Sequence, residues 1–303
     1  TPPSYAPPGN GVYLERAIAV HCVASAPSST DFVPPYCGTK ITRSWSSGLM
    51  DNLPTALTAP DPLGSVRTSL GDATGSPTPT NLAAKIAKLQ LDHGIVWSQR
   101  NQHPYQNMRD YGRELATDWV DALMMCITDD RTEALVQHVV QLGIDLYGIY
   151  EAGGKWPADG GHNVGRKSII MFAGKVLGVS DMMNIGDTGN AFQEDGNYYY
   201  NESGVAAWQI APGRGEDGIG TNYETLNYQL GMANATAMMH LGLVDAWGNN
   251  PYFEYMDDSR SAGRTCINTY HENVVSPNWD TLYAAAGIGP KPDPVCRVEP
   301  GFD

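Results

Sequence analysis

The sequence predicts a mainly α-helical protein built of antiparallel helical hairpins, and three observations lead to this fold class. In several long segments between residues 81 and 258, apolar residues recur every three or four positions, the spacing of a helix with one buried face. Two of these segments are separated only by a short polar turn, which makes the helices antiparallel neighbours. The helical spacing is lost in residues 1–80 and 180–220, where we expect long irregular loops.

Residues 1–80 are rich in proline, serine, threonine and glycine, and we expect an irregular, partly extended segment that packs on the main domain. Two runs in it resemble strands, Gly11–Val23 and Lys40–Trp45. A disordered linker is the alternative, but apolar residues such as Tyr13 and Ile18 argue for at least partial order.

Residues 81–303 are predicted to form a single α-helical hairpin domain. Asn81 is placed to cap a first helix that ends near residue 97. A second helix is predicted for residues 111–128 and a third for residues 131–150. The two residues between the last two helices leave room only for a tight turn, so these helices form a hairpin.

The second half of this domain alternates between loops and helices. Residues 155–178 begin as a glycine-punctuated loop and end as a helix. A long excursion follows over residues 180–220, and then a helix over 222–243 and a shorter one over 251–258. From Arg260 onwards we expect an irregular tail that holds two cysteines.

Hairpins arranged in a ring form an α/α toroid, whose cleft is built from the loops at one end. Six predicted helices are few for a complete ring. We therefore expect a partial toroid, or one completed by irregular segments and by sequence missing here. Because the sequence begins at Thr1 rather than at methionine, we expect that a signal, a propeptide or an upstream domain has been removed.

The composition limits the classes of partner. The net charge is −14, which argues against general binding to nucleic acid or to acidic membranes. No apolar run approaches the roughly 18 residues that a membrane span needs. A locally basic cleft that binds an anionic ligand remains compatible with this charge.

The five cysteines and the scarcity of lysine suggest a secreted or cell-surface protein. Disulfide bonds between Cys22 and Cys37 and between Cys266 and Cys296 would close two local loops. Cys126 lies in an apolar run and is predicted to be a buried free thiol. No cysteine or histidine spacing matches a zinc site.

Three polar clusters begin or interrupt the helices, and they hold the candidate site residues. The clusters are His103, Asn107, Arg109, Asp110, Tyr111, Arg113 and Glu114; then Glu151, Lys155, Trp156, Asp159, His162, Asn163, Arg166 and Lys167; then Gln193, Glu194, Asp195 and Tyr198 to Tyr200. Helix starts separated by a full hairpin return to the same end, so the first two clusters are expected to share one face.

The second cluster carries the strongest functional signal. Its glycines allow the backbone to pass close to a ligand, and a helix N-terminus attracts anions. His162, Arg166 and Lys167 stand at this junction of loop and helix. Two cations and a titratable imidazole there predict a site for an anionic ligand.

Loop-borne asparagine, histidine, arginine and tyrosine on such a scaffold resemble the polysaccharide lyases of the α/α-toroid type, the alginate, chondroitin and heparinase-like group. The segments NMRDYGRELA and GGHNVGRKSIIMFAG are also similar to uncharacterised secreted bacterial proteins. The resemblance is one of pattern and covers roughly residues 81–245. It implies a secreted enzyme that cleaves a uronate-containing polysaccharide by β-elimination.

The resemblance also implies a catalytic quartet. An amide, Asn107, aided by Arg166 or Arg109, would neutralise the uronate carboxylate. His162 or a tyrosine would remove the adjacent carbon-bound proton, and a tyrosine such as Tyr200 would protonate the leaving 4-oxygen. Other tyrosines compete for this last role: Tyr111, Tyr198, Tyr199 and Tyr223. The expected substrate-binding residues are His103, Arg109, Tyr111, Arg113, Lys155, Trp156, Asn163, Lys167 and Tyr199.

Each of these residues also has a structural interpretation. His162 would serve as a helix cap, Asn107 as a turn residue, Arg166 as part of a solvated helix start, and the tyrosine triplet as a strand edge. A non-catalytic extracellular module, which binds glycans or self-assembles at the cell surface, is therefore the alternative function.

A glycoside hydrolase with paired carboxylates is the second alternative. The candidate carboxylates are Glu151, Asp159, Glu194, Asp195, Glu216 and Asp217. No cofactor is predicted. Calcium is the one metal that the oxygen-rich loop would suit, although its spacing fits no EF-hand. The loop oxygens belong to Asp187, Asn190, Glu194, Asp195 and Asn197.

Overall fold

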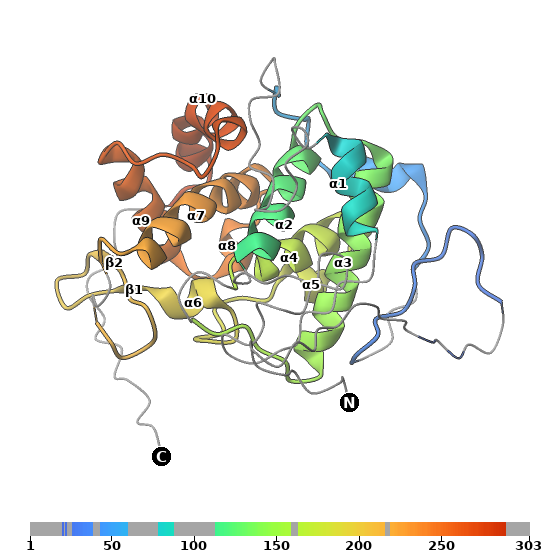
Figure 1. Cartoon of the computed structure of the whole chain (residues 1–303), viewed down its shortest axis with the longest axis horizontal. Helices are drawn as coiled ribbons and strands as arrows, with labels where there is room; N and C mark the ends of the chain where they lie inside the picture. Colours follow the sequence, from blue (N-terminus) through green and yellow to red (C-terminus); the bar gives the residue numbers. More distant parts are fainter. Residues whose placement is uncertain are drawn as a thin grey trace, which may run out of the picture.

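The protein is mainly helical, as the sequence predicts, and carries one small two-stranded sheet (Figure 1). This computed structural model describes residues 20, 22, 26–38, 43–59, 78–87, 113–158, 163–215 and 219–288. In chain order the elements are the 3-10 helix η1 (Ser47–Asn52), α1 (Pro79–Ile86), α2 (Arg113–Ile127), α3 (Glu133–Glu151), α4 (Arg166–Leu177), α5 (Ser180–Met183), α6 (Gln193–Asn197), β1 (Tyr198–Tyr200), β2 (Ala206–Trp208), α7 (Asn222–His240), α8 (Val244–Trp247), α9 (Asn250–Ser261) and α10 (Thr269–Ala285).

Helix α4 lies inside the bundle and is surrounded by the other helices (Figure 1). It packs most closely on α3, which in turn contacts α1. Helix α2 contacts α7, and α7 carries α9 and α10 on the opposite side of the molecule. Almost every residue of α4 is buried, including the cations Arg166 and Lys167 at its start.

The contact between α3 and α4 depends on a glycine. A methyl group added to Gly143 would lie 2.3 Å from Cβ of Ala173 and 2.8 Å from the carbonyl oxygen of Ile169. The absence of a side chain therefore lets the two helix backbones approach each other. Thr132 begins α3 with a side-chain cap, because its hydroxyl oxygen accepts a hydrogen bond from the Leu135 amide at 3.2 Å.

Residues 33–38 of the N-terminal segment lie against α3, whereas η1 contacts α4. Gln141 binds both backbone groups of Val33, at 2.8 and 2.9 Å, and Asp145 accepts the Tyr36 amide at 3.4 Å. At the next turn Gly148 faces Cys37. Main-chain hydrogen bonds therefore hold this segment along one side of the helix, and Phe32 and Pro35 add buried apolar contacts.

The long excursion over residues 180–220 contains short elements. Helices α5 and α6 and the strands β1 and β2 lie within it, and β1 pairs antiparallel with β2. The strand interpretation of the tyrosine triplet is confirmed, because these residues form β1. Asn201 shapes the turn between the strands, since its side-chain oxygen accepts the amides of Ser203 and Val205.

The prediction of an irregular tail is wrong for residues 269–285, which form helix α10. Asn268 caps this helix by accepting the His271 amide at 2.8 Å, and Trp279 donates its indole N–H to Asp257 at 2.8 Å. Pro277 lies inside the helix. A proline in a helical pattern usually marks a break, and here tertiary contacts outweigh that signal.

The predicted disulfide between Cys22 and Cys37 is absent, because both cysteines carry free thiols. Cys22 is exposed, whereas the turn at Cys37 is packed against α3, so the two side chains lie in different surroundings. Cys266 is likewise a free, buried thiol, and Cys296 lies outside the described residues. Cys126 is a buried free thiol, as predicted.

Among the described residues, no helix has the length and apolar character that crossing a membrane requires.

Candidate functional site

The candidate residues fall into two groups. Outside the described residues lie His103, Asn107, Arg109, Tyr111 and His162, and the side chain of Arg113 is likewise not described. The prediction that the first two clusters share a face therefore concerns side chains outside the described residues. It places the side chains of Lys155, Trp156, Asn163, Arg166, Lys167, Tyr199 and Tyr200.

The second and third polar clusters meet at the start of α4. Three consecutive residues of α6 each bind one of three alternate residues at the loop–helix junction, and we call this arrangement the junction clamp. Its contacts are Asn163 N to Gln193 Oε1 at 2.8 Å, Gly165 N to Glu194 Oε1 at 2.7 Å, and Lys167 Nζ to Asp195 Oδ1 at 2.6 Å.

The chain turns sharply at Gly165 to enter the helix. Its φ of 94° lies in the left-handed region, which favours glycine. A methyl group there would also lie 3.3 Å from Val120 on α2. The glycine thus fixes the direction in which the amides of the junction point towards α6.

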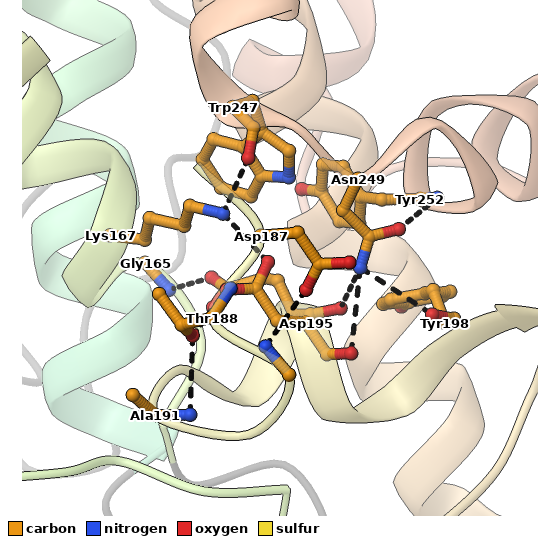
Figure 2. Close-up of polar contacts among 12 residues, drawn as sticks. Gly165, Lys167, Asp187, Thr188, Ala191, Asp195, Tyr198, Trp247, Asn249 and Tyr252 are labelled. Atoms are coloured by element: carbon orange, nitrogen blue, oxygen red, sulfur yellow. Dashed lines mark hydrogen bonds and ion pairs between the residues drawn. The ribbon is translucent and has the colours of Figure 1, made fainter. Parts of the chain in front are cut away.

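Lys167 is a fully buried cation with several partners (Figure 2). Besides Asp195, its ammonium group donates to the Trp247 carbonyl oxygen at 2.8 Å and lies 4.4 Å from the centre of the Trp247 ring. Burial lowers the pKa of Lys167, and the Asp195 carboxylate opposes this effect. Because both groups are buried away from water, each charge is compensated by the other, and removal of one would leave the other buried without a counter-charge.

Asp195 completes this pair from the other side. Its second oxygen, Oδ2, accepts the Thr188 hydroxyl at 2.6 Å and the Thr188 amide at 3.1 Å. Burial raises the pKa of Asp195, while Lys167 and Thr188 act in the opposite direction. Both carboxylate oxygens are thus bound within the protein.

Glu194 differs from its neighbour. Its Oε1 accepts the Gly165 amide, whereas Oε2 is buried and has no hydrogen-bond donor in the part of the chain that the structure describes. Burial raises the pKa of Glu194 to about 7, although the hydrogen bond from Gly165 lowers it. Glu194 is therefore a titratable group near neutral pH inside the fold.

Arg166 and Trp156 are also buried. The Arg166 guanidinium carbon lies 4.7 Å from the centre of the Trp119 ring, and one of its nitrogens donates to the Val164 carbonyl oxygen at 3.1 Å. The Trp156 ring stacks on Phe192 at 5.5 Å. Neither side chain has exposed surface with which to touch a polymer.

Both ends of the glycine loop are fixed to the fold. The Asn163 side chain donates to the Pro157 carbonyl oxygen at 2.9 Å, and the Ala158 amide donates to Asn190 Oδ1 at 3.0 Å. Residues 159–162 lie between these anchored positions and outside the described residues. His162 is therefore attached directly to a buried, fixed residue.

Lys155, Tyr199 and Tyr200 lie nearer the surface. Lys155 is exposed, and both tyrosines are partly buried. Tyr200 donates its hydroxyl to Glu254 Oε1 at 2.5 Å, and burial together with this carboxylate raises the tyrosine pKa. Its hydroxyl is therefore protonated at neutral pH.

Sequence reasoning missed two residues that support the clamp. The Asn249 amide nitrogen lies 3.4 Å from the Glu194 carbonyl oxygen and 3.5 Å from that of Asp195 (Figure 2). Asn234, which with Ala235 and Thr236 matches the acceptor pattern for N-glycosylation, is fully buried, and its Oδ1 lies 3.0 Å from the Ser168 hydroxyl oxygen. Asn249 also caps α9 locally by accepting the Tyr252 amide at 3.4 Å, but the contacts of both residues near the clamp join positions distant in the chain.

Within the described ranges, no three histidine, cysteine, aspartate or glutamate side chains gather to hold a metal ion. Most of the residues proposed as calcium ligands use carboxylate or amide oxygens to bind protein groups, as described above for Glu194 and Asp195. Asp187 accepts the Gly189 amide at 2.8 Å, and Asn190 accepts the Ala158 amide. The calcium hypothesis therefore gains no geometric support.

No protein-family model, curated protein or solved structure matches this chain.

Proposed function

We propose that the protein is a secreted carbohydrate-active enzyme that cleaves an anionic, uronate-containing polysaccharide by β-elimination. The observation that supports this best is the fixing of the loop over residues 159–162 at both of its ends, by Ala158 and Asn163. A catalytic group must be held in a narrow range of positions, and anchored chain on both sides restricts that range. His162 belongs to this loop.

In this mechanism the proton beside the uronate carboxylate passes to His162, a carbon–carbon double bond forms, and the bond to the 4-oxygen breaks. Tyr200, whose hydroxyl carries its proton at neutral pH, gives the leaving oxygen its proton. Asn107 and Arg109 contact the substrate carboxylate. Arg166 is too deeply buried for contact and contributes positive charge from the start of α4.

The remaining candidate residues divide by exposure. Lys155 is exposed to solvent and Tyr199 is partly exposed, so both side chains can contact an anionic polymer. Trp156, Asn163 and Lys167 are buried, so their contribution is to hold the loop in place. We further propose that the helical hairpins form part of an α/α ring with the loops at one end.

The test is to incubate the protein with a panel of uronate-containing polysaccharides and to follow the ultraviolet absorbance of the conjugated double bond. We expect a rising signal that His162→Ala reduces by about 10²–10⁴-fold, the contribution of a general base. His138→Ala, at a partly buried position on α3, is the matched control and should retain activity. Full activity in His162→Ala would overturn the assignment.

A non-catalytic glycan-binding or cell-surface module is the second candidate. It is favoured by the complete burial of Trp156, Asn163, Arg166 and Lys167, which is typical of a structural core. Binding to a polysaccharide of the panel without any cleavage would establish this function.

A glycoside hydrolase is the third candidate. Glu194 and Asp195 are too deeply buried to touch a polysaccharide, so the exposed Glu151 would be one of its carboxylates. New reducing ends without ultraviolet absorbance would establish hydrolysis.

A further inference from the structure

Unpartnered polar atoms concentrate around α6 and the start of α4. Each is buried and has no hydrogen-bond partner in the described part of the chain. On the segment from α6 into β1 these atoms are Glu194 Oε2, Asn197 Oδ1 and the Tyr198 hydroxyl oxygen. The others are Asn163 Oδ1, just before Gly165 in the chain, and Asn234 Nδ2 on α7. A buried polar atom without a partner destabilises the folded state, so such a concentration requires an explanation.

Several of these groups are demonstrably close together. Gly165 joins two of them, because its amide binds Glu194 while a methyl group on its Cα would lie 3.8 Å from Asn234 Nδ2. The charge of Glu194 also contributes to the raised pKa of Tyr198, which places that hydroxyl within electrostatic range. Asn163 lies at the same place, because its amide binds Gln193, the residue before Glu194.

The orientation of the amide side chains is fixed by their other contacts. Asn163 must direct its NH₂ group to the Pro157 carbonyl oxygen, and Asn197 must direct its own to the Gln209 carbonyl oxygen at 2.6 Å. Their oxygens are therefore true acceptors without donors. Ser168 has one hydroxyl proton for both Gly165 and Asn234, so either orientation of Asn234 leaves an amide atom without a protein partner.

The chemistry of these atoms selects the ligand. Carboxylate and amide oxygens accept, whereas the amide NH₂ and the tyrosine hydroxyl donate. A cation would satisfy only the acceptors, and an anion only the donors. Water offers both, and it also suits Glu194 in either state, since an ionised Oε2 needs a donor and a protonated one needs an acceptor.

We propose that the protein holds an ordered internal water site at the N-terminal end of α4, with at least one water bound to Glu194 Oε2. The water takes its further hydrogen bonds from among Asn163, Tyr198 and Asn234. Buried waters usually make about three such bonds to groups that lack protein partners. The site is independent of any catalytic activity, and it gives the buried Glu194 a group with which to exchange its proton.

The test is a crystal structure of the wild-type protein at a resolution that resolves waters. We expect a density peak about 2.5–3.2 Å from Glu194 Oε2, with a second polar contact to an amide or to the Tyr198 hydroxyl. Absence of density there, with Oε2 still buried, would overturn the proposal. An anomalous signal at the site after soaking in rubidium chloride would show a cation and would also overturn it.

A variant makes the assignment specific. Glu194→Met keeps a side chain of similar length without either oxygen, and the peak should be lost. Glu151→Met makes the same change at an exposed position on α3 and should leave the peak unchanged. A peak that persists in Glu194→Met would contradict the proposal, and if this variant does not fold, the wild-type density decides.

Discussion

At the scale of single residues, Lys167 is the side chain whose replacement should cost most. Lys167→Met removes the ammonium group and leaves the Asp195 carboxylate buried without its cation. Breaking a buried ion pair in this way costs about 3–5 kcal/mol. We expect urea denaturation to show a loss of this size in the free energy of unfolding.

The matched control is Lys155→Met, the same substitution at an exposed lysine in the loop before α4. Its effect should stay within about 0.5 kcal/mol. In the double variant Lys167→Met/Asp195→Asn the loss should be smaller than the sum of the two single losses, because the uncompensated charge is gone. Additive losses would show that the two residues do not interact.

Glu194 should give the protein a pH-dependent stability. Its pKa is about 7 in the folded protein and about 4.5 in the unfolded chain, so the folded state binds more protons between these values. The stabilisation is fully present below about pH 4.5 and is lost as the pH rises through about 7. The contribution of Glu194 to the free energy of unfolding is on the order of 3 kcal/mol, since a pKa difference of one unit is worth about 1.4 kcal/mol.

The measurement compares wild type with Glu194→Gln across this pH range. Glutamine keeps an oxygen for the Gly165 amide and imitates the protonated acid. We expect the variant to gain stability relative to wild type as the pH rises from about 4.5 to about 7. A constant difference between the two proteins would mean that Glu194 titrates alike in both states.

At the scale of elements, the polar stripe along α3 determines where the N-terminal segment lies. Glu133, Gln141 and Asp145 follow one another at multiples of four residues and so share one helix face. They bind the Trp45 indole N–H, the backbone of Val33 and the Tyr36 amide. The stripe ends at Gly148, where the segment passes closest to the helix.

Gly148→Ala should therefore displace this segment. The added methyl group would lie 2.2 Å from the Cys37 carbonyl oxygen and 2.5 Å from Cβ of Pro35. Overpacking of this kind costs about 1–3 kcal/mol and outweighs the roughly 1 kcal/mol that alanine gains over glycine in a helix. Hydrogen–deuterium exchange at Val33 and Tyr36 should become faster than in wild type.

Gly48→Ala is the control, because the nearest atom to its added methyl group, Ser46 Oγ, is 3.9 Å away. Exchange at Val33 should be unchanged in this variant. Equal exchange in Gly148→Ala and wild type would show that the segment is not held at this point.

The helices could be predicted where one apolar stripe dominates. The predicted helices over residues 111–128 and 131–150 appear as α2 and α3 to within about two residues, the usual uncertainty of helix ends. Helix α10 could not be predicted, since Pro277 interrupts its pattern and its stability comes from packing on α7. Tertiary contacts of that kind leave no local signal.

The junction clamp could be predicted only in part. Its members stood out as two polar clusters, but their pairing joins residues 28 to 30 positions apart. Charged side chains at a helix start are normally solvated, so no feature of the sequence predicted that Arg166 and Lys167 lie in the interior. The burial arises because α4 is enclosed on all sides, which is a property of the assembled bundle.

At the scale of the whole molecule, the exposure of the four described cysteines shows which of these positions the folded bundle shields from solvent. Cys22 is exposed and Cys37 partly so, whereas Cys126 and Cys266 are buried, and burial raises the pKa of both buried thiols. Alkylation requires an accessible thiolate. The folded bundle should therefore protect two of these four thiols and leave the other two reactive.

We expect iodoacetamide, in the absence of any reductant, to label Cys22 and Cys37 in the folded protein and to add Cys126 and Cys266 only in denaturant. Peptide mapping by mass spectrometry identifies each labelled site, and a reduced sample is the control for complete labelling. Labelling of Cys22 and Cys37 only after reduction would show that they form a disulfide.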